Sequence, residues 1–316
     1  MIDSFGRNIT YLRLSVTDLC DLRCRYCMPK EGVPKKPHGE ILTFEELVEI
    51  TEAAVELGVT KVRITGGEPL VRRGIVDLCA RIRQIPGLRE LALTTNGMML
   101  GSLAKPLKDA GVDRVNISLD TLDPDKFRQM TRFGDLRRVL EGLRAAMEAG
   151  LAPVKINTVL IGGFNDDEIA SFVEMTRENA IQVRFIELMP VGPAAAFPAE
   201  SFISCDEVLK KVSRLRPAGT SGVSRVYRLP GAAGTVGLIT PVSHEFCSGC
   251  DRVRVTSDGK LKPCLHSGEE IPLKGLHGAE LKEMISYGIG KKPASHDILS
   301  PGVRSAGDRT MNAIGG

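Results

Sequence analysis

The sequence predicts an α/β fold built around an open, partial (β/α)6 barrel that resembles part of a TIM barrel. Six strand-like runs, each followed or separated by a helix-length segment, occupy the first 190 residues of the 316-residue chain. This order is typical of parallel strands joined by right-handed crossovers. Because six units are too few to close an eight-stranded barrel, we expect the barrel to stay open.

Alternating and β-branched runs predict the strands, which lie at residues 11–16, 61–65, 91–95, 115–119, 154–161 and 183–188. Apolar residues at helical spacing predict the helices, at 42–58, 73–85, 102–110, 135–150 and 165–180. The first helix has the clearest start and stop signals. Thr43 fits an N-cap with Glu46 three residues later, and Gly58 ends the pattern.

The strand ends predict where chemistry takes place. In parallel α/β folds the reactive groups gather at the C-terminal ends of the strands. Here those ends carry segments 17–27, 65–69, 94–97, 118–120 and 187–190, which indicates one shared site. After residue 190 the alternation stops and Gly/Pro-rich stretches follow. We therefore expect a barrel domain over residues 1–190 and a small, irregular, cluster-binding region over 191–316.

Composition argues against several classes of protein. The net charge is only +3, no apolar run reaches membrane-spanning length, and no export segment opens the chain. Aromatic residues make up 4% of the chain without any tryptophan, which argues against a zinc-stabilised nucleic-acid-binding module. We expect a cytoplasmic protein without membrane or nucleic-acid partners, in which cysteines stay reduced and available to metals.

A first group of three cysteines, Cys20, Cys24 and Cys27, has the spacing CxxxCxxC. A closed zinc or iron–sulfur site takes four protein ligands. Three thiolates can hold a [4Fe–4S] cube and leave one iron open to a small molecule. The alternative is a zinc loop completed by His38 or by a distant cysteine. The next cysteine, Cys79, lies on an apolar helix face and is expected in the core.

A second incomplete group lies far down the chain: Cys247, Cys250 and Cys264. The last of these follows a hairpin predicted to turn at 257–259. A structural zinc site completed by His244 or His266 is one interpretation. Arg252 and Arg254 alternate on one strand face beside the group, and guanidinium groups can bind phosphates in bidentate fashion. The remaining cysteine, Cys205, is assigned no role.

Two motifs resemble those of the radical S-adenosylmethionine superfamily. CDLRCRYC is similar to its cluster loop, and TGGEP at 65–69 is similar to the turn that holds the methionine amino group. RITGGEPLVR, LTTNG, NISLDTL, RFIELMP, CxxCDRVRVTSDGKLKPCL and the terminal Gly-Gly extend the resemblance, over essentially the full length, to the superfamily's enzymes of molybdenum cofactor biosynthesis. Asp251 departs from that family, which usually has asparagine there.

The resemblance implies two [4Fe–4S] clusters, S-adenosylmethionine as cofactor and GTP as substrate. A 5′-deoxyadenosyl radical would remove the C3′ hydrogen of GTP, and the sugar radical would attack C8. The product would be (8S)-3′,8-cyclo-7,8-dihydroguanosine 5′-triphosphate. The implied partners are a reductant protein of flavodoxin or ferredoxin type and a downstream cyclic pyranopterin monophosphate synthase, with a homodimer left open. A peptide-modifying radical enzyme is the alternative, but such enzymes usually carry more C-terminal cysteines.

The resemblance also implies the site residues, and none of them acts as a general acid or base. S-adenosylmethionine would be bound by Tyr26, Gly67, Ser118 and Met189. GTP would be bound by Arg13, Arg63, Thr94, Lys155, Arg252, Val253 through its backbone, and Arg254. Lys61 and Arg184 are weaker candidates, for which an outer-face position is as well supported. The C-terminal Gly315 and Gly316 would reach the active-site region.

Overall fold

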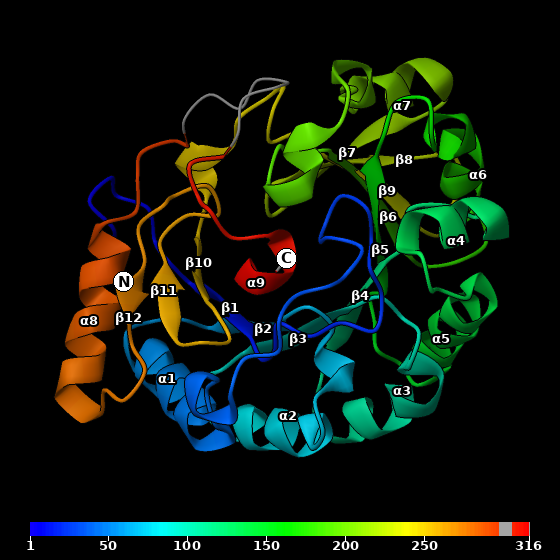
Figure 1. Cartoon of the computed structure of the whole chain (residues 1–316). Coiled ribbons are helices and arrows are strands. Elements are labelled where there is room, and N and C mark those ends of the chain that lie inside the picture. Colours follow the sequence, from blue (N-terminus) through cyan, green and yellow to red (C-terminus); the bar gives the residue numbers. More distant parts are fainter. Residues whose placement is uncertain (297–304, 316) are drawn as a thin grey trace.

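The computed structural model describes residues 1–296 and 305–315. Its strands are β1 (Tyr11–Ser15), β2 (Lys61–Thr65), β3 (Glu90–Thr95), β4 (Arg114–Ser118), β5 (Lys155–Leu160), β6 (Gln182–Glu187), β7 (Arg216–Ser221), β8 (Ser224–Arg228), β9 (Thr235–Ile239), β10 (Arg252–Val255), β11 (Lys260–Lys262) and β12 (Ile271–Pro272). They form one 12-stranded sheet in the order β12-β11-β10-β1-β2-β3-β4-β5-β6-β9-β8-β7. The sheet curves around a central space without closing through hydrogen bonds between its described end strands (Figure 1).

The helices are α1 (Phe44–Glu56), α2 (Ile75–Arg83), α3 (Leu100–Asp109), α4 (Pro124–Thr131), α5 (Leu136–Glu148), α6 (Ile169–Glu174), α7 (Asp206–Lys211), α8 (Gly278–Gly290) and α9 (Met311–Ile314). α1 to α6 and α8 surround the outside of the sheet, whereas α9 lies at its centre (Figure 1). No described helix combines the length and apolarity needed to cross a membrane.

The predicted six-stranded parallel core is confirmed. β1 to β6 lie in sequence order, and each pairs in parallel with the next. Thr43 and Glu46 form the expected capping box at the start of α1. The sequence prediction missed α4, although Asp123 followed by Pro124 is a typical helix start. The Asp123 carboxylate accepts hydrogen bonds from the N–H groups of Asp125 and Lys126.

The strands separate an apolar outer face from a polar inner face. On β1, Leu12 and Leu14 are buried in the core between sheet and helices, whereas Tyr11 and Arg13 line the central cavity. Successive side chains of a strand point to opposite faces, so the parallel register repeats this pattern on neighbouring strands. Closed β/α barrels fill their interior with bulky branched side chains. Here the polar inner face leaves room for a ligand.

The C-terminal region is more regular than we expected. Its strands β9 and β10 pair in parallel with β6 and β1, so they extend both edges of the six-stranded core. The predicted hairpin is confirmed as β10–β11. The sequence prediction missed β7, β8, β9 and β12, because short runs between glycine- and proline-rich segments carry little periodicity. The domain boundary at residue 190 stays a prediction.

The core between the sheet and the helices should contribute strongly to the stability of the protein, and one buried side chain tests this. Phe185 on β6 is fully buried and meets Phe172 of α6 edge to face at 6.2 Å. Phe185→Ala should lower the free energy of unfolding by about 3–5 kcal/mol, through lost burial and the cavity left behind. Met147→Ala on α5 is the control, because this side chain is 39% exposed. Urea denaturation giving equal losses for both variants would contradict the assigned core.

Candidate active site

A cavity of about 810 Å³ occupies the interior of the barrel. Its wall is made by the inner faces of β1 to β6, both cysteine groups and α9. Cysteines more than 200 residues apart in the sequence therefore border one space. The volume falls in the upper part of the range found for small-molecule sites.

The first cysteine loop is bound directly to the glycine-rich turn after β2. The N–H of Gly67 donates to the carbonyl of Thr17 at 2.7 Å, and that of Glu68 donates to Leu19 at 2.8 Å. A Cβ atom on Gly67 would lie 2.3 Å from the Leu19 carbonyl oxygen. Glycine is therefore required here for the two loops to touch. This contact explains why CxxxCxxC and TGGEP occur together.

The carboxylate of Glu68 fixes the turn to the end of the next strand. It accepts hydrogen bonds from Thr95 Oγ1 at 2.8 Å and from the backbone N–H groups of Asn96 and Leu70 at 2.6 and 3.0 Å. Burial raises the pKa of Glu68 to about 7, although these hydrogen bonds favour the charged form. Glu68 thus acts as a structural link between β2 and β3.

Burial opposes ionisation of the thiols in the first group. It raises the pKa of Cys27 to about 12 and that of Cys24 well above its usual value. Thiolates in such surroundings need a neighbouring positive charge, which a bound metal provides. The loop is compact, because the N–H groups of Cys27 and Met28 both donate to the Cys24 carbonyl. The donor set fits an iron–sulfur cluster.

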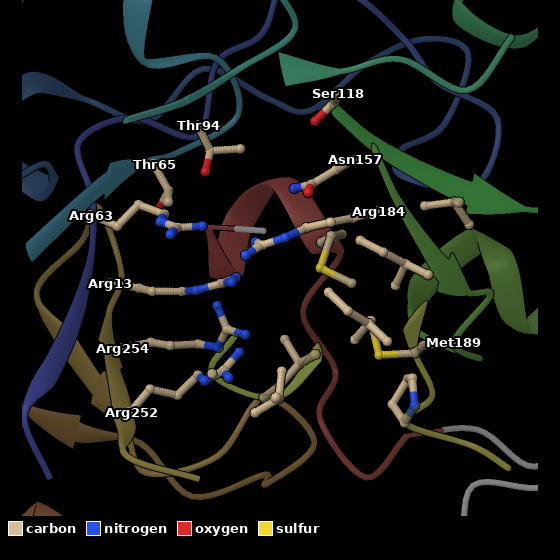
Figure 2. A pocket seen from close by; sticks show the side chains of 18 of the residues that line it. Arg13, Arg63, Thr65, Thr94, Ser118, Asn157, Arg184, Met189, Arg252 and Arg254 are labelled. Atoms are coloured by element: carbon tan, nitrogen blue, oxygen red, sulfur yellow. The ribbon is translucent and has the colours of Figure 1, made fainter. Parts of the chain in front are cut away.

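The residues expected to bind S-adenosylmethionine come together on the cavity wall. Tyr26, Gly67, Ser118 and Met189 all line it, and Figure 2 shows Ser118 and Met189. The Tyr26 hydroxyl donates to Asp120 Oδ2 at 2.8 Å, while Asp120 Oδ1 accepts the N–H of Val159 at 2.9 Å. This chain of bonds fixes the Tyr26 ring beside the first cysteine group.

Positive charge surrounds the second cysteine group. Burial raises the pKa of Cys250, but Arg252 and Lys292 outweigh it and the pKa falls below its usual value. Lys292 also donates to the carbonyl oxygens of Arg252 and Pro263, at 2.9 and 3.1 Å. Arg7 donates to the Cys247 carbonyl at 2.9 Å. The sequence prediction missed Lys292 and Arg7, because neither lies near the cysteines in the sequence.

The histidines considered as zinc ligands lie in different surroundings. His38 is exposed and does not line the cavity. His244 lies 3.2 Å from Asp206, whereas His266 lines the cavity and packs against His296. In the part of the chain that the structure describes, no three His, Cys, Asp or Glu side chains converge on a single-ion site. In a cube, each thiolate binds a different iron, so such convergence is not needed.

Seven arginines line the cavity, of which Arg89 is exposed and Arg114 pairs with Glu90. The other five have no described carboxylate within ion-pair distance: Arg13, Arg63, Arg184, Arg252 and Arg254. Arg63, Arg13, Arg254 and Arg252 lie one above another along one wall, and Arg184 reaches towards them from the other side (Figure 2). The Nε atoms of Arg13, Arg63 and Arg252 are buried without a hydrogen-bond partner. Burial and neighbouring positive charges lower the pKa of Arg63 to about 9. Such a cluster fits a polyanionic ligand.

The other residues expected to bind GTP divide into two groups. Thr94, Lys155 and Lys61 line the cavity, whereas Val253 is buried and does not. A contact through the Val253 backbone stays a prediction. Arg184 occupies the cavity side of β6, not the outer face. Its direction was ambiguous in the sequence because the inward position on β6 could not be fixed.

The remaining polar and thiol residues lie outside the cavity or at its edge. Cys79 and Cys205 are fully buried in the core. The carbonyl of Asp251 accepts the N–H groups of Thr10 and Tyr11 at 3.0 and 3.1 Å, so this residue fixes the start of β1 against the second cysteine loop. These contacts use the backbone. The Asp251 side chain adds one more, because its Oδ2 accepts the Thr10 hydroxyl at 3.3 Å, a bond that an asparagine carbonyl oxygen could also accept.

The C-terminal tail enters the barrel and reaches the arginine cluster. Arg254 donates from Nη1 to the Gly315 carbonyl at 3.1 Å, and Asn312 donates to the Asp18 carbonyl at 3.0 Å. Before α9, Arg309 binds Glu270 through two hydrogen bonds, at 2.5 and 2.7 Å, and also pairs with Asp258. Gly316 lies outside the described residues.

The two separate cysteine groups make a prediction about iron content. The reconstituted parent should contain about eight iron atoms per chain, and Cys264→Ser should lose about four of them, because each cubic cluster holds four. Cys79→Ala is the control, since Cys79 lies in the core. Iron and sulfide analysis measures the loss. Removal of all iron by Cys264→Ser would contradict two independent sites.

Comparisons with known proteins identify the family of the chain. Residues 14–176 match a family model described as the radical SAM superfamily, and residues 181–298 match one described as Molybdenum Cofactor Synthesis C. The chain is similar to GTP 3′,8-cyclases from Alkaliphilus oremlandii (50% identity, 100% of both chains) and Peptoclostridium acidaminophilum (54% identity, 94% of both chains).

The fold is similar to the crystal structure of Streptococcus suis SuiB bound to S-adenosylmethionine. The TM-score is 0.61 at 16% identity, and the match covers 91% of this chain and 67% of that one. This likeness concerns the fold alone, whereas the full-length identity to the cyclases defines the closer relationship. The chain belongs to the radical SAM superfamily and, within it, to the GTP 3′,8-cyclase family.

Proposed function

We propose that this protein is an enzyme that converts GTP into (8S)-3′,8-cyclo-7,8-dihydroguanosine 5′-triphosphate, the first step of molybdenum cofactor biosynthesis. The observation that carries the proposal is one cavity bordered by two three-cysteine groups and by five guanidinium groups without carboxylate partners among the described residues. The first group fits a cluster that binds S-adenosylmethionine, and the second fits a cluster beside an anionic substrate.

Cys20, Cys24 and Cys27 would hold the first [4Fe–4S] cluster, and the second group would hold the other. Bound and reductively cleaved, S-adenosylmethionine supplies the radical that removes the C3′ hydrogen of GTP. The chain's own contribution is to hold the cofactor. The turn at Gly67 offers close backbone approach, while Tyr26, Ser118 and Met189 line the remaining wall.

The arginine cluster would hold the triphosphate. GTP brings about four negative charges, which a nearly neutral protein must balance with locally concentrated cations. Arg13, Arg63 and Arg254 lie at equivalent register positions on β1, β2 and β10, so their guanidinium groups face the same volume. Arg252, Arg184, Lys155 and Thr94 complete the wall. Arg252 lies close to Cys250. A phosphate chain bound at Arg252 would therefore place the nucleotide beside the second cluster.

The tail would close the site from the barrel centre. Asn312 lies at the first cysteine loop, and Gly315 lies at Arg254 of the substrate wall. A Cβ atom on Gly315 would lie 2.7 Å from Thr65 Oγ1, so a residue with a side chain would not fit there. We infer that the tail positions both ligands.

The proposal includes partners and a location. A flavodoxin- or ferredoxin-type protein would supply electrons, and a cyclic pyranopterin monophosphate synthase would take the product. None of the eight cysteines forms a disulfide, which fits a reducing cytoplasm.

Product identification tests the function. The reconstituted protein is incubated anaerobically with GTP, S-adenosylmethionine and a reductant, and the nucleotide product is analysed by mass spectrometry and NMR. We expect the 3′,8-cyclised triphosphate together with 5′-deoxyadenosine. Cleavage of S-adenosylmethionine with intact GTP would contradict the proposed substrate.

The arginines beside the second cysteine group make a specific prediction. Arg252→Ala combined with Arg254→Ala should lower kcat/KM for GTP at least about 100-fold, because two charge-assisted phosphate contacts are lost. Uncoupled cleavage of S-adenosylmethionine should stay measurable. The matched control combines Arg81→Ala with Arg83→Ala on the outer helix α2, also two residues apart. If the variant that combines Arg252→Ala with Arg254→Ala cyclises GTP at the parent rate, these two arginines do not bind the phosphates.

Lys155 predicts a pH dependence of GTP binding. Burial, Arg184 and Arg114 lower the pKa of Lys155 to about 7, so the free protein increasingly holds it neutral above that pH. Phosphate binding needs the charged form. The affinity ratio between the parent and Lys155→Gln should therefore fall several-fold between pH 6.5 and 8.5, measured by calorimetry. Titration of GTP itself cancels in this ratio, and a constant ratio would contradict the role of Lys155.

A further inference from the structure

Tyr11 is an inward-facing residue that the assigned substrate contacts do not use. It is the first residue of β1, and the parallel register places it next to Lys61 on β2 and Arg252 on β10. It lines the cavity, so it lies on the same face of the sheet as Arg13. Its hydroxyl oxygen is buried, and no described residue accepts its proton, because the Arg13 guanidinium beside it can only donate a hydrogen bond.

The Tyr11 ring lies within the arginine cluster. Its centroid is 5.3 Å from the guanidinium carbon of Arg63, 5.8 Å from that of Arg252 and 6.0 Å from that of Arg13. Aromatic rings attract cations at such distances. Tyr11 therefore partly offsets the repulsion among three arginines that have no carboxylate partner in the described chain.

The chemistry around the hydroxyl determines what it can bind. Arginine side chains only donate hydrogen bonds, so none of the three can accept the phenolic proton. Glu90 lies one strand beyond Lys61 in the same register row, and its carboxylate is bound to Arg114. Burial raises the pKa of Tyr11, but Arg63, Arg13 and Arg252 outweigh it and lower the pKa to about 8. Below that pH the hydroxyl keeps its proton and donates more strongly than an ordinary phenol. The missing partner must be an acceptor brought by the ligand.

We propose that Tyr11 is a further ligand of the substrate's phosphate chain, with its hydroxyl donating a hydrogen bond to a phosphate oxygen. This inference rests on the proposed function. Phosphate oxygens only accept and are negatively charged, which suits a donor surrounded by guanidinium groups. A nucleobase or a sugar would use the phenol but would leave the three arginines uncompensated.

Tyr11→Phe tests the inference because it keeps the ring and removes only the hydroxyl. Dissociation constants for GTP and for inorganic triphosphate are measured by anaerobic calorimetry on the reconstituted enzyme. We expect both ligands to bind about tenfold more weakly or worse, the loss typical of a hydrogen bond to a charged group. Iron content and affinity for S-adenosylmethionine should match the parent, which excludes general misfolding.

The control is Tyr227→Phe on β8, which removes a hydroxyl outside the cavity wall. It should leave both phosphate ligands at parent affinity. If Tyr11→Phe binds triphosphate like the parent, while the Arg252 and Arg254 double variant does not, the Tyr11 assignment is wrong and the proposed function stands. If the parent itself binds neither GTP nor triphosphate, the proposed function fails and the Tyr11 assignment with it.

Discussion

Five guanidinium groups point into one barrel without a carboxylate partner among the described residues, and the rest of the site depends on that charge. Buried cations that repel one another cost free energy unless an anion joins them. The cost is visible in the lowered pKa values of Arg63, Arg184 and Lys155. A protein with a net charge of only +3 has therefore concentrated positive charge where a triphosphate would bind.

Strand register is what creates this concentration. Parallel pairing of β10 with β1 places Arg254 beside Arg13, and pairing of β1 with β2 places Arg63 on the other side. The same pairing brings the second cysteine group, which flanks β10, to the cavity that the first group borders. One structural fact, the return of the C-terminal chain to the edge of β1, thus joins the two incomplete metal sites.

The sequence was sufficient for the core barrel, and most of the residues that it singled out for chemistry line the central cavity. Alternation predicted β1 to β6, and the spacing of Cys20, Cys24 and Cys27 predicted an open iron. It could not give the pairing of short C-terminal strands, on which the joining of the two sites depends. Nor could it give the direction of Arg184, the buried hydroxyl of Tyr11 or the pairing of Arg309 with Glu270, because these follow from register and long-range contacts.

The central claim is that both cysteine groups serve one reaction in one cavity. Transfer of deuterium from GTP labelled at C3′ tests it most directly, with 5′-deoxyadenosine analysed by mass spectrometry after anaerobic turnover. The account predicts one deuterium in 5′-deoxyadenosine, because the radical and the substrate sugar share the same space. Unlabelled 5′-deoxyadenosine formed alongside cyclised GTP would contradict it.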